Sequence, residues 1–463
     1  MSAGGERSSP VVFGGSNEGD ASNTFGAIHH FYQPFREIPR WSRPNSHERA
    51  GVLPEVNGEI HEECYRRVLA SPEGIPQGLT LSFYGSLREW MKIEQPADFE
   101  QARQNIRDLG SRAEWQVLAD PFFHNIMPLK PRKTQDMLVK IGLAAIWQDF
   151  GIKPRGFWLP ETAVDNTTLE VLAQNGIEFV ALRDSQVPDM VDMGTNVVYA
   201  DLGLSGHKIA IVRFDSVLSG TVSFEDWITV DADGFLQGRR KEGRDVNIAT
   251  DGELFGHHKE FRDMFIRRAA DPEVQRKYCL QPLDMEHELK VLAEAQRSAR
   301  VLERTSWSCL NGHELGRWTG DARCGCDGEP SRESRSFKRQ LFQTLDRYGQ
   351  EIDRRLDAIN PDWRDKFVAF ALAIKGSIYG NSSVGESIAK LAVQPGFEFL
   401  TNSRMRDLYL ARFAGLMGET SCFNFFGGKE RPERQIAQVN IREIKRLLPD
   451  IDRVGKESAQ AAV

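Results

Sequence analysis

Short apolar runs rich in β-branched and aromatic residues alternate with amphipathic stretches from residue 24 to about residue 260. The runs that predict strands are residues 25–31, 79–83, 115–119, 156–159, 178–182, 208–214 and 246–250. The stretch 133–150 places Leu138, Ile141 and Ala145 on one face and is followed by Gly151, which predicts a helix and its end. Strands that alternate with helices indicate a mainly parallel sheet, either a closed barrel or a doubly wound sheet.

After residue 260 the strand signals fade and helical periodicity takes over. The helices predicted there are residues 341–359, 362–378, 404–417 and 434–448. The start of the chain is rich in Gly, Ser, Asn and Glu, which is typical of disorder. We therefore predict a disordered tail over residues 1–23, an α/β domain over 24–300, an α-helical domain over 301–450 and a flexible tail over 451–463.

Charge and apolar content exclude several classes of partner. The 463 residues include 66 acidic and 59 basic side chains, a net charge of -7, without a block of Lys or Arg, so we expect no nucleic acid. The longest apolar run, residues 367–374, is far too short to span a membrane, and residues 1–23 lack the apolar stretch of a secretory signal. Six cysteines in a chain of this length do not suggest a disulfide framework. We expect a cytoplasmic protein without a membrane partner.

Glu161 ends the segment Gly156-Phe157-Trp158-Leu159-Pro160-Glu161. A central strand cannot continue through Pro160, because proline lacks an N–H group. Glu161 is therefore expected just past the C-terminal end of a strand, where α/β barrels place their catalytic groups. The alternative is that Glu161 interacts only with the start of the helix that follows near residues 165–168.

A second group of ionisable residues follows the apolar run 246–250. Asp251, Glu253, His257 and His258 lie within eight residues and are interleaved with glycines. Such a group costs stability if it serves only packing, and the glycines indicate a backbone shaped for close approach. The alternative is that Asp251 caps a helix and the histidines lie on the surface.

Glu161 and Asp251 thus both follow predicted parallel strands, and a barrel gathers its strand ends around one axis. A retaining glycosidase needs two carboxyl groups about 5 Å apart, one to attack the anomeric carbon and one to protonate the departing oxygen. The sequence therefore predicts glycoside chemistry by the pair of Glu161 and Asp251. Whichever of the two is the proton donor needs a pKa above its solution value, which for an aspartic acid is about 3.9.

Short segments along the chain resemble the motifs of glycoside hydrolase family 57, and more closely its branch with a C-terminal domain of unknown function. Four segments in order carry the resemblance: His30-Phe31-Tyr32-Gln33-Pro34, Phe123-His124-Asn125-Ile126-Met127-Pro128-Leu129, Phe157-Trp158-Leu159-Pro160-Glu161 and Asp251-Gly252-Glu253-Leu254-Phe255-Gly256. Signatures of that branch are similar to Ser306-Trp307-Ser308-Cys309, Arg317-Trp318, Cys324-Gly325-Cys326 and Thr420-Ser421-Cys422.

The resemblance implies a distorted (β/α)7 barrel followed by an α-helical C-terminal region. It implies a retaining mechanism on α-glucans, with Glu161 as nucleophile, Asp251 as acid/base, and no metal or other cofactor. Members hydrolyse, branch or rearrange α-1,4 and α-1,6 linkages, and the motifs do not distinguish these outcomes. The expected partner is therefore an α-glucan or oligosaccharide substrate, while linkage preference and oligomeric state stay open.

Three positions depart from the family pattern. Ile28 stands where the family usually has a histidine, and strand alternation directs the neighbouring His29 to the other face. His124 stands where many members carry a glutamate, and residues 424–428 replace an aromatic and acidic stretch. These departures affect substrate contacts and leave the two carboxylates in place.

Further residues are expected to bind substrate or to support the carboxylates: His30, Gln33, His124, Trp158, Glu253, His257, Trp307 and Trp318. The histidines would contact sugar hydroxyls or orient Glu161, Glu253 would act from behind Asp251, and the tryptophans would offer faces for sugar rings. The alternative for each histidine and tryptophan is a place in the core. The sequence does not decide which of His257 and His258 faces the cleft.

Cys309, Cys324, Cys326 and Cys422 form a group with two possible roles. Zinc sites prefer two to four residues between paired cysteines, so the one-residue gap in Cys324-Gly325-Cys326 fits poorly. We therefore expect a buried reduced cluster that shapes a loop of the cleft. A structural metal is the less favoured alternative.

Two other functions compete with a retaining α-glucan hydrolase or transglycosylase. A carbohydrate-binding protein on an inactive scaffold would account for the departures at Ile28 and His124. A metal-dependent deacetylase or mannosidase-like hydrolase would use zinc ligands from His29, His30, Asp251 and His257. Such metal enzymes do not need the segment 158–161, so we favour the glycosidase.

Overall fold

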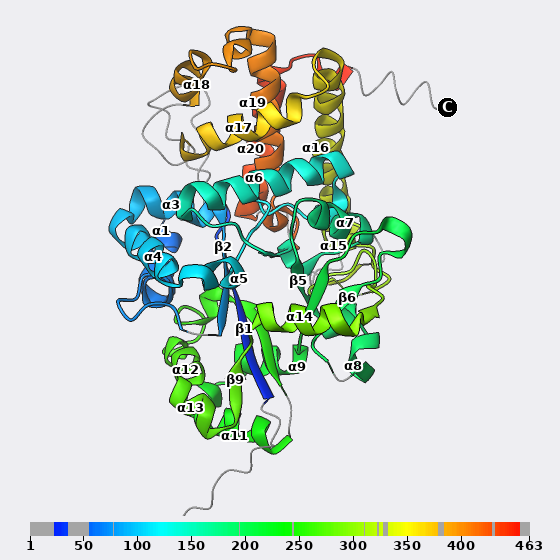
Figure 1. Cartoon of the computed structure of the whole chain (residues 1–463). Coiled ribbons are helices and arrows are strands. Elements are labelled where there is room, and N and C mark those ends of the chain that lie inside the picture. The colour runs from blue at the N-terminus through cyan, green and yellow to red at the C-terminus, as the bar shows by residue number, and fades with distance from the viewer. Residues whose placement is uncertain are drawn as a thin grey trace, which may run out of the picture.

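The computed structural model describes residues 23–35, 55–76, 78–193, 195–242, 245–309, 311–321, 324–326, 332–377, 384–427 and 431–453. Nearly all of the two predicted tails, over 1–23 and 451–463, lies outside these residues. Figure 1 shows an α/β part with a purely helical part stacked on one side of it. This division agrees with the change of pattern in the sequence.

Most strands are short and pair in parallel. In the described residues they are β1 Asn23–Phe31, β2 Leu79–Phe83, β3 Val117–Leu118, β4 Gly156–Phe157, β5 Phe179–Arg183, β6 Val197–Ala200, β7 Ala210–Phe214, β8 Val246–Asp251, β9 Leu280–Pro282 and β10 Ser298–Ala299. One sheet has the order β3-β2-β1-β8, with β9 also paired to β1, and the other has the order β10-β6-β7-β5-β4. Only β6 and β7 pair antiparallel in these described ladders.

Backbone contacts join the two sheets into one ring. Ala119, just after β3, forms a parallel bridge with Phe157 of β4. On the other side, the N–H of Asp215, after β7, donates to the carbonyl oxygen of Asn247 in β8 at 2.8 Å. The parallel strands β8, β1, β2, β3, β4, β5 and β7 thus make a distorted (β/α)7 barrel, with β6 inserted beside β7 as the distortion.

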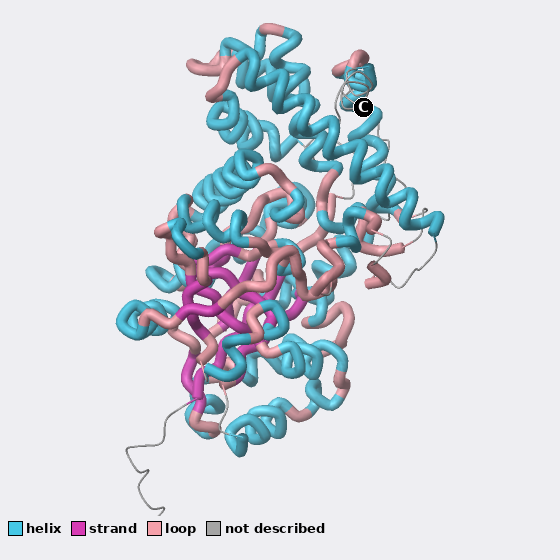
Figure 2. The backbone as a smooth tube through the Cα atoms, turned by 90° about the vertical axis from the view of Figure 1, so that its right-hand side faces the viewer, coloured by secondary structure: helices cyan, strands magenta, loops and turns pink. Residues whose placement is uncertain are grey.

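Helices surround the strands, which gather in one compact group in Figure 2. The helices of the barrel part are α1 Glu55–Ile60, α2 Arg66–Val68, α3 Gly85–Glu94, α4 Pro96–Asp108, α5 Ala113–Gln116, α6 Arg132–Phe150, α7 Asn166–Gln174, α8 Asp189–Met193, α9 Ser216–Phe224, α10 Trp227–Val230, α11 Ala232–Glu242, α12 Arg262–Ala269, α13 Pro272–Lys277 and α14 Met285–Ala295. Beyond them lie α15 Gly316–Thr319, α16 Arg332–Ile359, α17 Trp363–Ile374, α18 Val384–Ala392, α19 Ser403–Gly418 and α20 Pro432–Leu447.

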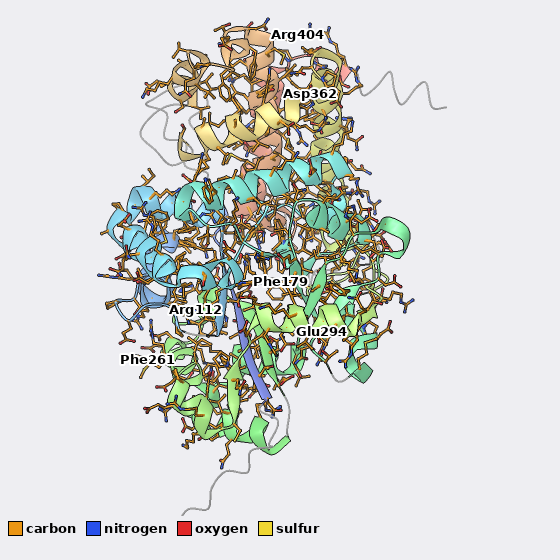
Figure 3. The ribbon with its side chains drawn as sticks, in the orientation of Figure 1. Arg112, Phe179, Phe261, Glu294, Asp362 and Arg404 are labelled. Atoms are coloured by element: carbon orange, nitrogen blue, oxygen red, sulfur yellow. The ribbon has the colours of Figure 1, made fainter. Side chains whose placement is uncertain are left out.

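The apolar pattern of the strands divides the core into two clusters. Ile28, Leu118, Trp158 and Phe179 belong to a small cluster inside the barrel, and Phe179 is labelled near the middle of the molecule in Figure 3. A larger cluster fills the space between the strands and the helices and continues into the helical part. Parallel strands buried on both faces read as nearly continuous apolar runs, which is why the sequence identified them.

The helical part packs against the C-terminal rim of the barrel. Thr420 forms an antiparallel bridge with Asn125, which lies in the loop after β3. The Asn125 side-chain amide donates to the backbone oxygens of Leu416 and Glu419 at 3.0 and 3.1 Å. These buried contacts fix the helical region at the end of the barrel where the strands' carboxyl ends gather.

Several predicted elements need correction. The strand over 115–119 is limited to Val117–Leu118, because Trp115 and Gln116 end α5, whose single apolar turn resembles a short strand in sequence. The helix over 362–378 ends at Ile374 and continues as a 3-10 turn over Lys375–Ser377. Strands β6, β9 and β10 and helix α18 were not predicted. Every helix in the described part of the chain is too short or too polar to cross a lipid bilayer.

Candidate active site

Glu161 and Asp251 line the same cleft of about 340 Å³ at the C-terminal ends of β4 and β8. The described residues around this cleft also include Arg183, Phe214, Ser216, Ser219, Ser223, Thr250, Trp307, Ser308 and Phe425. The two carboxylates therefore converge on one space, although they are far apart in the sequence. This is the spatial arrangement that the strand ends predict.

The backbone turns sharply at Glu161. After β4 the chain passes through Pro160 into a one-turn 3-10 segment, Pro160–Thr162, in which Glu161 has left-handed angles, φ 57° and ψ 20°. Such a conformation costs a side-chain-bearing residue about 1–3 kcal/mol and concentrates at functional sites. Thr162 holds the turn, because its hydroxyl donates to Gln186 at 2.9 Å and accepts the N–H of Trp307 at 2.9 Å.

Two donors hold one oxygen of the Glu161 carboxylate. The indole Nε1 of Trp307 and the hydroxyl of Ser308 each donate to Oε2 at 2.8 Å. Burial raises the pKa of Glu161, whereas these two hydrogen bonds and the nearby Arg317 guanidinium favour its ionised form. Both of these donors bind the same oxygen, Oε2.

Asp251 is the last residue of β8 and opens into the cleft. It lies opposite His30 in the parallel register of β1 and β8. Partial removal of its carboxyl group from bulk water in the cleft, together with the negative charges of Glu253 and Glu161, raises its pKa well above the usual range of an aspartic acid. The repulsion by Glu161 means that the two carboxyl groups are close enough for the ionisation of one to oppose that of the other.

Three of the predicted site residues stack on one another near the C-terminal ends of β1, β3 and β4. His30 stacks on Trp158 and on His124, with 5.0 Å between ring centroids in both pairs. The Nε2 atoms of His30 and His124 are 3.0 Å apart, and His124 Nδ1 is 2.5 Å from the hydroxyl of Ser421. Burial lowers the pKa of His30 to about 3 and lowers that of His124, so both rings stay neutral. None of the three is among the described residues that line the cleft.

Gln33 and Glu253 form a polar layer behind Asp251. Gln33 Nε2 donates to Glu253 Oε1 at 2.7 Å and to the hydroxyl of Tyr65 at 2.8 Å. Glu253 therefore acts on Asp251 through its charge while its side chain is held by Gln33. This is the supporting place that its position two residues after Asp251 suggests.

The remaining predicted site residues separate. Trp307 lines the cleft and contacts Trp158 edge-on. Trp318 is fully buried, and its Nε1 donates to the backbone oxygen of Ser421 at 2.9 Å. His257 Nδ1 lies 2.6 Å from Glu63, away from the residues that line the cleft. His257 and His258 lie in a turn that precedes α12.

Sequence reasoning missed three residues around Glu161. Ser308 donates to the carboxylate, Arg317 contributes a positive charge, and Arg183 Nη1 holds the backbone oxygen of Trp307 at 3.0 Å. Ser308 and Arg317 lie in the segments that resemble the family's C-terminal signatures, which was the available signal. Nothing in the local pattern around Arg183 identifies its role.

Chemically, the cleft pairs a carboxyl group that receives two hydrogen bonds, on Glu161, with one whose pKa is raised well above the usual range, on Asp251. An ionised carboxylate can act as a nucleophile, and a carboxyl group with a raised pKa can act as a general acid. The described residues that line the cleft include Phe214, Phe425 and Trp307 as apolar surface and several hydroxyl groups as hydrogen-bonding partners. Such a mixture suits a ligand that has both flat apolar faces and hydroxyl groups.

Known proteins with similar sequences match part of the chain. It is 26% identical to alpha-amylase 1 of Dictyoglomus thermophilum over 184 residues, which cover 39% of this chain and 26% of the amylase. It is 24% identical to the 4-alpha-glucanotransferase of Thermococcus litoralis over 142 residues, or 30% of this chain and 21% of that protein. The matches thus span about a quarter of the length of these relatives.

Solved structures match nearly the whole fold. An exo-type maltose-forming amylase from Pyrococcus sp. ST04 aligns with a TM-score of 0.63 at 13% identity, over 94% of this chain and 80% of its own. A branching enzyme from Thermococcus kodakaraensis aligns with a TM-score of 0.59 at 13% identity, over 93% of this chain and 90% of its own. At such low identity these likenesses establish the fold.

The model of glycosyl hydrolase family 57 matches residues 28–294. This range is more than half of the chain and contains the end of β1, all of β2 to β9, both carboxylates, and His30 and His124. The chain therefore belongs to glycosyl hydrolase family 57.

Proposed function

We propose that this protein is a retaining glycoside hydrolase or transglycosylase that acts on α-glucans. The observation that carries the proposal is the shared cleft of Glu161 and Asp251, at the ends of two strands of a family 57 barrel. Double displacement requires an ionised attacking group and a protonated donor on opposite sides of one glycosidic bond. The sequence offers these two carboxyl groups at the corresponding motifs.

The surroundings of the two carboxyl groups support a fixed division of labour. Burial raises the pKa of Glu161, but two hydrogen bonds and the charge of Arg317 oppose this rise and favour the ionised form. Asp251 faces the negative charges of Glu253 and Glu161, which favour its protonated form. One proton shared by the pair therefore resides on Asp251.

In this mechanism Glu161 Oε1 attacks C1 of the bound glucosyl unit while Asp251 donates its proton to the departing glycosidic oxygen. A glycosyl ester on Glu161 forms, and the leaving sugar diffuses away. Asp251, now ionised, removes a proton from water or from a sugar hydroxyl, which attacks C1 and releases Glu161. Water as acceptor gives hydrolysis, and a sugar hydroxyl gives transfer or branching.

The proposed catalytic unit includes both parts of the chain. The barrel over 24–300 supplies Glu161 and Asp251, and the region over 301–450 supplies the Trp307 and Ser308 donors. The α-glucan as substrate is supported by the amylase and glucanotransferase relatives, and a cytoplasmic location stays a prediction. No nucleic acid or membrane partner is proposed.

The test combines a nucleophile variant with product profiling. Wild-type protein is incubated with maltooligosaccharides, amylose and glycogen: shortened chains indicate hydrolysis, a redistributed ladder indicates transfer, and new α-1,6 linkages indicate branching. E161A should lose turnover, and added azide should restore it partly by forming a β-glycosyl azide, whose configuration is inverted. Undiminished activity of E161A would exclude Glu161 as the nucleophile. Glucan binding by the wild type without any turnover would favour a binding protein instead.

A further inference from the structure

A cluster of three cysteines and one histidine lies beside the cleft. The ligand atoms of Cys309, His313, Cys324 and Cys326 all lie within 4.8 Å of one another, and two of the residues are buried. Cys309 Sγ and Cys324 Sγ are 3.8 Å apart, and His313 Nδ1 is 3.1 Å from Cys326 Sγ. His313 therefore takes the place that the sequence prediction gave to Cys422, whose thiol instead lies 4.0 Å from the hydroxyl of Ser421.

These four atoms have the composition and spacing of a tetrahedral zinc site. Zinc–sulfur bonds of about 2.3 Å in a tetrahedron place two sulfurs about 3.8 Å apart, and three cysteines with one histidine are a frequent structural ligand set. The distance between Cys309 Sγ and Cys324 Sγ equals this value. A disulfide would require about 2.0 Å, and none of the six cysteines, all of which are described in the structure, is in a disulfide.

We propose that Cys309, His313, Cys324 and Cys326 together bind one zinc ion at a structural site. The one-residue gap between Cys324 and Cys326 does not prevent this, because the other two ligands come from a separate segment, which precedes α15 in the sequence. The three thiols would release their protons to solvent on binding, since thiolates are the zinc ligands. Three thiolates and Zn²⁺ leave one net negative charge, and Arg317, which donates to the Cys326 oxygen, lies beside it.

The site would stabilise the loop that holds the proposed nucleophile, a consequence that rests on the proposed function. Cys309 directly follows Trp307 and Ser308, the two donors to Glu161. The N–H of Cys309 donates to the Ser306 hydroxyl at 2.9 Å, which closes a tight turn around these donors. A metal bound at Cys309 would therefore fix their positions relative to the carboxylate.

The first experiment measures metal directly. Protein is produced in zinc-containing medium, purified under reducing conditions without chelator, and analysed by elemental mass spectrometry. We expect about one zinc per chain. After removal of zinc, added Co²⁺ should give thiolate-to-cobalt charge-transfer absorption and the visible bands of a tetrahedral site.

A pair of variants separates the site from general effects of cysteine loss. C324S should contain at least ten times less zinc than the wild type and lose the cobalt charge-transfer bands. C279S is the matched control, because Cys279 is a half-buried free cysteine outside the cluster, and it should retain one zinc. Circular dichroism of both variants shows whether they fold. The same measurements on H313A should repeat the loss.

Several results would overturn the proposal. Wild-type protein that neither contains zinc nor gives cobalt bands would exclude the site, as would full zinc content in C324S. An intact mass lower by two hydrogens, together with the loss of two titratable thiols, would show that two of these cysteines form a disulfide and do not bind a metal. Metal content is independent of turnover, so an inactive protein with one zinc would leave this site intact while refuting the proposed function.

Discussion

Trp307 contacts Glu161 through two hydrogen bonds. Its backbone N–H donates to the backbone carbonyl oxygen of Glu161 at 3.2 Å. Its indole Nε1 donates to the side-chain oxygen Oε2 of Glu161 at 2.8 Å, across a separation of 146 residues. The left-handed turn at Glu161 alone would leave the carboxylate free to choose among rotamers. The two hydrogen bonds from one residue fix both the turn and the side chain that it presents.

Ser308, the second donor, should be removable without loss of this turn. In S308A the ionised form of Glu161 loses a hydrogen bond worth about 1.5–3 kcal/mol, so kcat/KM should fall about 10- to 100-fold. Loss of a donor to the carboxylate raises the pKa of Glu161, and the acidic limb of the pH–rate profile should move to higher pH. Initial rates on a maltooligosaccharide across pH check both effects.

The matched control is S223A. Ser223 lines the same cleft, but its hydroxyl donates to the backbone oxygen of Ser219 at 2.7 Å. Loss of this hydroxyl should therefore leave the acidic limb of the pH–rate profile unchanged. An unchanged limb in S308A, or an equal shift in S223A, would show that Ser308 does not tune the charge of Glu161.

Glu253 should control the opposite side of the pH profile. Its negative charge disfavours ionisation of Asp251 and so contributes to the raised pKa of that group. E253Q keeps an oxygen for the Gln33 amide but removes the charge, so the pKa of Asp251 should fall and the basic limb should move to lower pH. The acidic limb, set by Glu161, should move much less.

Glu294 provides the comparison for that variant. It is an exposed acid on α14, labelled in Figure 3, and E294Q removes the same charge at a distance from the cleft. Both limbs of its profile should match those of the wild type. A basic limb that stays in place in E253Q would mean that another group carries the essential proton.

The sequence singled out the two carboxylates because each follows a short apolar run and stands in a motif. Glu161 comes after a proline that ends its strand, and Asp251 ends the six-residue strand β8. The short strands β6, β9 and β10 lack such signals, since two to four residues show no reliable period. Their pairing is decided by tertiary contacts, as in the antiparallel pair of β6 and β7.

Contacts between distant segments limited the prediction of the site. Strand alternation correctly separated His29 from His30: His29 Nδ1 lies 2.8 Å from the Thr250 hydroxyl, while His30 faces Trp158. The partnership of His313 with the cysteines was missed, because ligand spacing in sequence does not reveal which turns meet in space. The three residues beside Glu161 that reasoning missed come from the same kind of long-range contact.

Asp251 should be needed for poor leaving groups and dispensable for good ones. Removal of a general acid costs about 10²- to 10⁴-fold, so D251A should lose this much activity on maltooligosaccharides. Fluoride leaves from an α-glucosyl fluoride without being protonated. With this substrate D251A should therefore form the glycosyl ester at nearly the rate of the wild type. Rapid-quench measurement of the fluoride burst checks the first step.

Azide gives a stereochemical comparison between the two carboxylates. In D251A azide should attack the ester on Glu161 and give an α-glycosyl azide, with configuration retained, whereas E161A gives the β-anomer. An equal loss on both substrates, or the same anomer from both variants, would contradict the assigned roles.

The buried histidines of β1 should make the fold sensitive to mild acid. Burial lowers the pKa of His29 and of His30 to about 3, against 6.5 for an unperturbed ring. Below pH 6.5 these two histidines bind protons in the unfolded chain but stay neutral in the folded protein. The free energy of unfolding therefore decreases as the pH falls from 6.5 towards 3. At pH 5 the loss is about 2 kcal/mol per histidine, from about 1.4 kcal/mol per pH unit.

H29Q isolates one of these groups. The glutamine amide can keep a hydrogen bond to the Thr250 hydroxyl, but it does not titrate. Between pH 7 and pH 5 the free energy of unfolding, measured with urea, should therefore fall by about 2 kcal/mol less in H29Q than in the wild type. H287Q is the control, because His287 is exposed on α14 and should leave the wild-type slope unchanged. Because the pH dependence comes from the folded barrel and not from catalysis, it should persist unchanged in E161A. A wild-type slope in H29Q would mean that His29 binds its proton equally well in the folded and in the unfolded protein.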